Sequence, residues 1–184
     1  MNYYGAKELA NSFRTVRKNT IQVAEDIPED QYGFTPAEGT RSIGRTLAHI
    51  ALSPQFQLTI HAGERRASFD GFDFPALMKR MADQEAAERT KSQVIELLQT
   101  EGEVWASFLE GVSDDFLAES FTLPPGATPP SKSRLEMLLS VKEHEMHHRG
   151  QLMVVQRILG IVPHLTRLRQ EHAAQQAQAA SSGS

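Results

Sequence analysis

The sequence contains no cysteine among its 184 residues. Without a thiol, the chain has no cysteine nucleophile, no cysteine-ligated zinc and no disulfide framework. The lack of disulfides suits the reducing environment of the cytoplasm. A chain of this length can bury a hydrophobic core without such crosslinks. We therefore expect a cytoplasmic protein whose fold is stabilised by side-chain packing.

The chain also lacks a basic excess and a long apolar run. Its formal net charge is -4 at pH 7, whereas nucleic-acid-binding proteins usually carry excess Lys and Arg on one face. No apolar stretch approaches the roughly 18 residues of a membrane span, and residues 1–5 begin no cationic, apolar signal. We expect a soluble protein that binds neither nucleic acid nor membrane. Phosphate-binding loops, nucleotide-binding fingerprints and Ser-centred nucleophile elbows are also missing. No sequence motif therefore indicates the substrate.

Four long stretches carry apolar residues at alternating spacings of three and four, which is typical of helices with one buried face. These stretches cover residues 6–24, 42–62, 90–111 and 131 or 133 to 159. Phe13 and Leu98 are expected core residues, and Pro54 should kink the second helix. A loop followed by a short helix is expected over 69–82. No segment shows strand alternation, so the sequence predicts an all-α four-helix bundle.

Proline and glycine divide the chain between these helices. Residues 28–40 and 123–130 contain too many of them for regular structure, and the second segment should be an extended connection. Gly160 and Pro163 end the fourth helix. The Ala/Gln-rich tail beyond has no apolar face. We therefore expect a bundle domain over 1–163 and a peripheral C-terminal extension over 164–184.

The fourth helix contains a histidine-rich run, His144-Glu145-Met146-His147-His148-Arg149-Gly150-Gln151. His144 and His148 are four positions apart, so one helix face carries both and can offer them to one divalent metal. At about 100° per residue, His144, His148 and Gln151 interrupt the apolar stripe, His147 lies at its edge, and Glu145 and Arg149 point toward solvent. Burying two imidazoles costs free energy unless each finds a polar partner, which a metal would supply. The alternative is a solvated face rich in histidine.

A third ligand would have to come from another helix. His49 borders the apolar face of the second stretch and is the candidate, although a core histidine bonded to a neighbour is an equally good interpretation. We expect His61, His164 and His172 at the surface. Glu101 interrupts the apolar stripe of the third helix, where a carboxylate is rarely unpaired. It could approach the metal, bond a ligand histidine, pair with an arginine or reach solvent.

Over residues 6–160 the chain resembles the DinB (YfiT-like) family of metal-binding four-helix bundles. The resemblance rests on Leu47–Ile50 after a Pro-rich loop and on His144-x-x-x-His148 followed by Arg-Gly-Gln. Residues 34–44 are also similar, although Arg41 replaces an aromatic residue frequent near that position. The resemblance implies a zinc or nickel site with water in open positions, and frequent dimers. Its ligands would be His49, His144 and His148.

Three nitrogen ligands suit Zn²⁺ or Ni²⁺ and leave a position open for water, as in catalytic sites. Gln151 would then orient a bound ligand, and Glu101 would act as a general base or as the partner of a ligand histidine. We expect Gly150 to permit close approach of a neighbouring helix.

Two functional hypotheses follow. One is a metal-dependent enzyme acting on a small molecule, either a hydrolase or, as the resemblance implies, an S-transferase that uses a low-molecular-weight thiol. The other is a non-catalytic metal-binding or stress-response module. A pocket that opens onto the free position of the metal would favour the enzyme.

Overall fold

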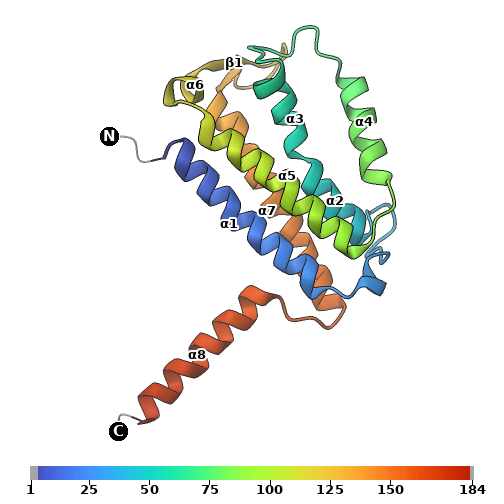
Figure 1. The fold of residues 1–184 in the computed structure, drawn as a ribbon, viewed down its shortest axis with the longest axis vertical. Coiled ribbons are helices and arrows are strands. Elements are labelled where there is room, and N and C mark those ends of the chain that lie inside the picture. Colours follow the sequence, from blue (N-terminus) through green and yellow to red (C-terminus); the bar gives the residue numbers. More distant parts are fainter. Residues whose placement is uncertain (1–3, 183–184) are drawn as a thin grey trace.

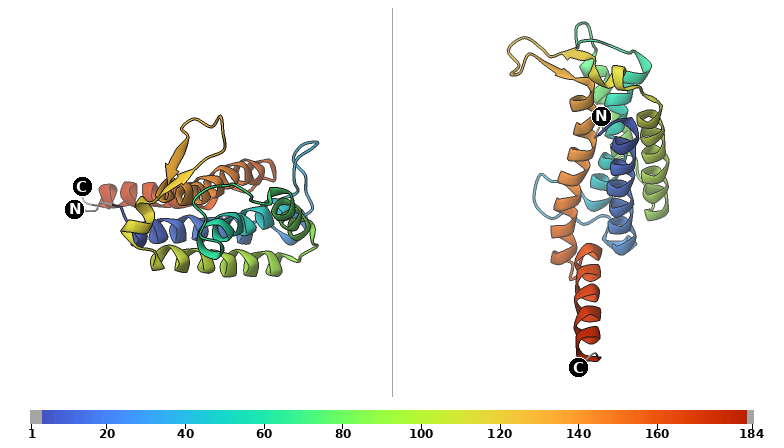
Figure 2. Two further views of the ribbon diagram at one scale, coloured as in Figure 1. Left: turned by 90° about the horizontal axis from the view of Figure 1, so that it is seen from above. Right: turned by 90° about the vertical axis from the view of Figure 1, so that its left-hand side faces the viewer.

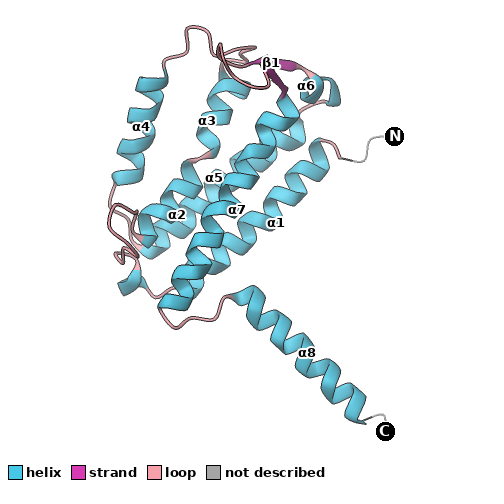
Figure 3. Cartoon of the chain, turned by 180° about the vertical axis from the view of Figure 1, so that it is seen from behind, coloured by secondary structure: helices cyan, strands magenta, loops and turns pink. Residues whose placement is uncertain are grey.

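The computed structural model describes residues 4–182 and is built largely from helices (Figure 1). The bundle consists of α1 (Ala6–Asp26), α2 (Ile43–Leu52) continued by α3 (Pro54–Leu58), α5 (Lys91–Gly111) and α7 (Arg134–Ile158). Helix α5 packs on α1 and α2. Helix α7 lies between α1 and α2 when the molecule is seen from behind (Figure 3). The predicted all-α four-helix bundle is confirmed.

Three of the bundle helices begin at side-chain caps. A hydroxyl oxygen accepts a backbone N–H from the third residue of each helix at the starts of α2, α5 and α7; these caps are Ser42, Thr90 and Ser133. Thr90 and Gln93 also form a capping box. At the other end of α7, Gly160 adopts a φ of 77°, which favours glycine and lets the chain turn away.

Pro54 divides the predicted second helix. Helix α2 ends at Leu52, and Pro54 begins α3, where its missing N–H removes no helical bond. Helix α3 continues into a π-helical turn, η2 (Thr59–Gly63). The stretch expected as one kinked helix is therefore three consecutive helical pieces.

Several short elements complete the fold. Helix α4 (Phe74–Ala86) is longer than predicted, and η1 (Glu29–Gln31) and α6 (Asp114–Ala118) are single turns. Two three-residue strands, β1 (Ser120–Thr122) and β2 (Ser131–Ser133), pair antiparallel on either side of the Pro-rich segment. No strand was expected there, because three residues are too few to show an alternating pattern.

The core has two main clusters. The two residues predicted to be in the core, Phe13 and Leu98, belong to different clusters. Leu98 is fully buried with Val23 and Ile50 between α1, α2 and α5. Phe13 is buried against the edge of Trp105, with ring centroids 6.4 Å apart. The expectation that Phe13 and Leu98 are core residues is confirmed.

The C-terminal segment forms helix α8 (His164–Ser182), which projects away from the bundle (Figures 1 and 2). Its first turn is attached to α1, because His164 bonds Asn19 and Arg167 pairs with Asp26. Residues 171–181 are exposed. Within residues 4–182, no helix combines the length and apolarity that crossing a membrane would require.

Candidate metal centre

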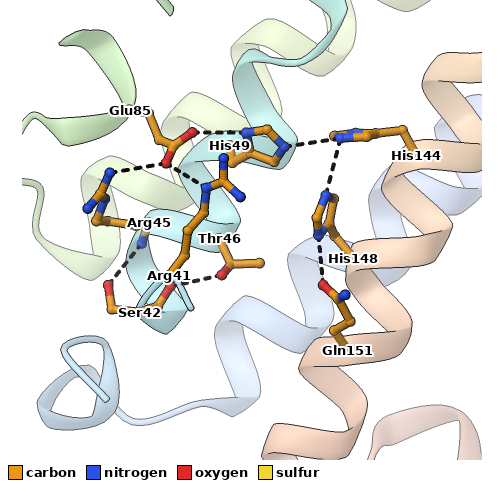
Figure 4. A network of polar contacts seen from close by, with 9 residues as sticks. All are labelled: Arg41, Ser42, Arg45, Thr46, His49, Glu85, His144, His148 and Gln151. Carbon is orange, nitrogen blue, oxygen red and sulfur yellow. Dashed lines mark hydrogen bonds and ion pairs between the residues drawn. The ribbon is translucent and has the colours of Figure 1, made fainter. Parts of the chain in front are cut away.

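Three histidines meet where α2 packs on α7 (Figure 4). The Nε2 atom of His144 lies 3.0 Å from Nε2 of His49 and 3.2 Å from Nε2 of His148. One ligand nitrogen from each ring lies within 4.8 Å of the other two. The structure thus brings together the three residues that helix spacing and resemblance selected.

The other nitrogen of two rings is held by an oxygen that can only accept a hydrogen bond. Nδ1 of His49 lies 2.9 Å from Oε2 of Glu85, and Nδ1 of His148 lies 2.8 Å from Oε1 of Gln151. In a neutral ring the proton therefore resides on Nδ1, and Nε2 presents its lone pair. His49 and His148 consequently direct two lone pairs toward the same point.

His144 cannot satisfy both neighbours. Its Nδ1 is buried without a hydrogen-bond partner, and a proton on its Nε2 could serve only one of the two facing nitrogens. At least one lone pair in the cluster stays unmatched. A divalent cation bound by all three nitrogens would use every lone pair, so the donor set fits a metal.

Burial keeps these imidazoles neutral at pH 7. It lowers the pKa of His144 to about 4, and the charges of His148 and His49 act in the same direction. Burial also lowers the pKa of His49, with a further contribution from Arg41, and it lowers the pKa of His148. Since only neutral imidazole binds a metal, the cluster is in its binding form at neutral pH.

The carboxylate that supports the cluster is Glu85, near the end of α4. Its Oε1 accepts hydrogen bonds from Nε of Arg41 at 2.6 Å and from Nη2 of Arg45 at 3.3 Å, while Oε2 faces His49. Burial alone would raise the pKa of Glu85, but the hydrogen bonds and charges of Arg41 and His49 lower it below its ordinary value. An ionised Glu85 both orients His49 and increases its basicity. No local sequence pattern indicated Glu85.

The predicted role of Glu101 stays a prediction, and the structure places this residue outside the group of three histidines. Its carboxylate accepts a hydrogen bond of 3.2 Å from Gln55. Gln151 does lie at the site, where it bonds both His148 and His147. Its side chain is exposed at the edge of a cavity and holds the ring of His148 in place.

The close helix approach predicted at Gly150 is wrong, since a Cβ there would meet nothing within 4 Å. The crowded glycine is Gly102 on α5. A Cβ at Gly102 would lie 2.9 Å from Cγ of Arg17, so the glycine makes room for that arginine. Arg17 is itself buried, with 4% of its surface exposed.

Glu145, expected toward solvent, is fully buried. Its carboxylate forms an ion pair of 2.9 Å with Arg17. Arg17 also donates to the carbonyl oxygens of Leu98 and Ile50, so this one side chain links α1 to α2, α5 and α7. Arg149, also expected toward solvent, is half-buried and donates to the carbonyl oxygen of Val16.

Two histidines expected at the surface are buried instead. Nδ1 of His61 accepts a hydrogen bond of 2.7 Å from Arg134, and burial lowers the pKa of His61 to about 4. His164 is enclosed where α8 meets α1. Only His172 of the three is exposed, as predicted.

A cavity of about 770 Å³ opens beside His148 and Gln151. Its size is in the range of small-molecule binding sites. Arg41, Arg45 and Glu85 form part of its wall. Of the three clustered histidines, His148 lines this cavity, so the cluster borders a space large enough for a small molecule.

Comparison with known proteins identifies the family. The model of the DinB superfamily matches residues 12–152. The chain belongs to the DinB superfamily. One relative in this superfamily, the uncharacterized protein YjoA of Bacillus subtilis strain 168, is 24% identical over 155 residues, which cover 84% of this chain and 91% of YjoA.

Solved structures share the DinB fold. The crystal structure of YjoA superposes with a TM-score of 0.61, covering 83% of this chain and 92% of YjoA. YfiT from Bacillus subtilis, described as a probable metal-dependent hydrolase with an unusual four-helix bundle topology, superposes with a TM-score of 0.63 at 17% identity. That match covers 88% of this chain and 91% of YfiT. At these identities the likeness establishes the fold.

Proposed function

We propose that this DinB-superfamily protein is a metal-dependent hydrolase whose divalent ion is held by His49, His144 and His148. The observation that carries the proposal is the convergence of three Nε2 atoms at 3.0 and 3.2 Å, with two rings held in the metal-binding tautomer. The description of the structural neighbour YfiT as a probable metal-dependent hydrolase supports the same chemistry.

The remaining residues of the site prepare it for a metal. Glu85 fixes the ring of His49, and Gln151 fixes the ring of His148. Three neutral nitrogen ligands suit zinc or nickel. When bound, such an ion supplies Lewis acidity that lowers the pKa of water and polarises a carbonyl group.

The cavity beside His148 favours an enzyme over a non-catalytic metal-binding module. A module that only stores or senses a metal has no need of a substrate-sized space at the ligands, whereas a hydrolase requires one. A thiol-dependent S-transferase would use the same three histidines, and the substrates tested must therefore distinguish the two reactions.

The first test is metal content, measured by plasma mass spectrometry on full-length protein purified without an immobilised-metal column. We expect about one equivalent of zinc or nickel, its loss in His148→Ala, and its retention in His172→Ala, which changes an exposed histidine. Equal metal content in all three proteins would show that the site lies elsewhere.

The second test is turnover. The metal-loaded protein is assayed against ester and amide substrates and, separately, against thiol-conjugation substrates, with His144→Ala as the control. Hydrolysis that disappears in His144→Ala supports the proposal. Conjugation without hydrolysis would assign the transferase instead, and hydrolysis that survives in His144→Ala would exclude chemistry at this site.

A further inference from the structure

The cavity beside His148 has two chemically different walls. One wall is polar and carries Arg41, Arg45 and Glu85. The other is formed by α7 beyond Gln151, where the buried side chains of Leu152 and Val155 lie at the core and Val154 and Ile158 lie at the surface. Val154 and Ile158 are 58% and 60% exposed, which is high for large apolar side chains. A ligand that fills this cavity would touch charge at one end and apolar surface along its body.

The charged wall has an excess of positive charge. Two guanidinium groups share Oε1 of one carboxylate, Glu85, whose other oxygen is bonded to His49. Among the residues that the structure describes, Glu85 is the only acidic one that lines the cavity. One positive charge at the mouth is therefore not neutralised by the described residues of the wall.

Arg41 also has hydrogen-bond donors that Glu85 does not use. It uses Nε for Glu85, and in residues 4–182 its two terminal nitrogens form no hydrogen bond with the protein. The side chain is 41% exposed and reaches from the loop before α2 toward His49 (Figure 4). Because Glu85 fixes the guanidinium through one edge, the paired terminal nitrogens remain available for a planar, two-point contact.

We propose that the cavity binds an amphipathic carboxylate, whose anionic group is recognised by Arg41 and Arg45 and whose apolar body lies on Val154 and Ile158. The inference rests on the proposed function in one respect, since it names the substrate class of the same site. A substrate held in this way would place its polar end beside His148. Arg41 is then a specificity-determining residue that selects for charge.

The test compares three probes of one shape by isothermal titration calorimetry at pH 8 with the full-length protein as purified. The probes are 4-phenylbutyrate, 4-phenylbutan-1-ol and 4-phenylbutylamine. We expect the carboxylate to bind about tenfold more tightly than the alcohol, as one partly exposed charge-assisted contact allows, and the amine to bind least. Equal binding of carboxylate and alcohol, tighter binding of the amine, or no binding of any probe would overturn the proposal.

Variants test which wall of the cavity recognises the carboxylate and which binds the apolar body of the probe. Arg41→Gln and, independently, Arg45→Gln should each reduce the preference for the carboxylate several-fold and leave alcohol binding unchanged, whereas Val154→Ser should weaken both. Arg14→Gln is the matched control, because Arg14 also forms ion pairs with carboxylates, here Glu103 and Glu110, and is similarly exposed at 33%. It should bind all three probes like the parent protein. A carboxylate preference that persists in both Arg41→Gln and Arg45→Gln would refute the assignment.

Repeating the titrations after chelation separates this proposal from the metal site. A carboxylate that binds only to a metal would lose its preference on chelation, and this result would overturn the role of the arginines. A preference that survives chelation and depends on Arg41 supports the proposal, even if the protein proves to bind no metal and the hydrolase assignment fails.

Discussion

Replacing Glu85 with glutamine tests how the site is held together. The substitution preserves the size of the side chain and an oxygen that can accept from His49, but it removes the negative charge. In the parent protein that charge faces Nδ1 of His49 at 2.9 Å and pairs with Arg41 and Arg45. We expect Glu85→Gln to weaken zinc binding, because His49 becomes less basic and two guanidinium groups are left beside a dication.

The size of the effect follows from the contacts of Glu85. Loss of a carboxylate that supports a ligand histidine typically reduces metal affinity about 10–100-fold, which corresponds to about 1.4–2.7 kcal/mol. Only 9% of the Glu85 side chain is exposed, so screening by solvent is small and the upper half of the range is expected. The affinity is measured at pH 7 by competition with a chromogenic chelator.

Glu119→Gln provides the matched control, because Glu119 also pairs with two arginines, Arg65 and Arg134, but bonds none of the three clustered histidines. It should bind zinc like the parent protein. If Glu85→Gln binds as tightly as the parent, or if Glu119→Gln loses as much affinity, the supporting role of Glu85 is refuted.

Three further predictions concern stability. Glu145→Ala should lower the free energy of unfolding in urea by about 3–5 kcal/mol, since it leaves Arg17 buried and unpaired, whereas Arg17→Met combined with Glu145→Leu should recover much of that loss; additive costs would contradict this. The pKa of His61 is about 4 in the folded protein, below its unfolded value of about 6.5, so the unfolded state binds more protons and stability falls as pH decreases between these values. His61→Gln should reduce that slope by up to about 1.4 kcal/mol per pH unit, and an unchanged slope in urea titrations would refute the assignment. Truncation after residue 172 should change the free energy of unfolding by no more than about 0.5 kcal/mol, because residues 171–181 are exposed, and a larger loss would show that α8 packs on the bundle.

The features of this structure that the sequence predicts well depend on residues close together along the chain. The starts of α5 and α7 are set by Thr90 and Ser133 and their capping boxes, which are read within four positions. His144 and His148 share a face because helix geometry brings positions four apart together. Selecting His49 needed more, since its helix spacing left a core histidine equally acceptable and the family resemblance decided between them.

The prediction for Glu145 is wrong because its helix packs against neighbouring helices on two sides. The helical wheel of α7 was interpreted with one buried face and one solvent face, which placed Glu145 outside. Helix α7 instead lies between α1 and α2, so the face about 100° away from His144 meets α1 and buries Glu145 against Arg17. Glu85 was missed for a related reason. It lies 36 positions from His49, on a helix whose own pattern does not indicate which neighbour it will cover.

These missed residues matter for the metal centre because they set the relative position of its two helices. Arg17 donates to the carbonyl oxygen of Ile50, the residue after His49, and to the carboxylate of Glu145, the residue after His144. A single buried guanidinium therefore ties both histidine-bearing helices together one position away from His49 and His144. It fits there because Gly102 leaves space for its side chain. The spacing of the histidines thus specifies which nitrogens can share a metal, whereas the distance between His49 and His144 depends on an arginine, a glutamate and a glycine from three different helices.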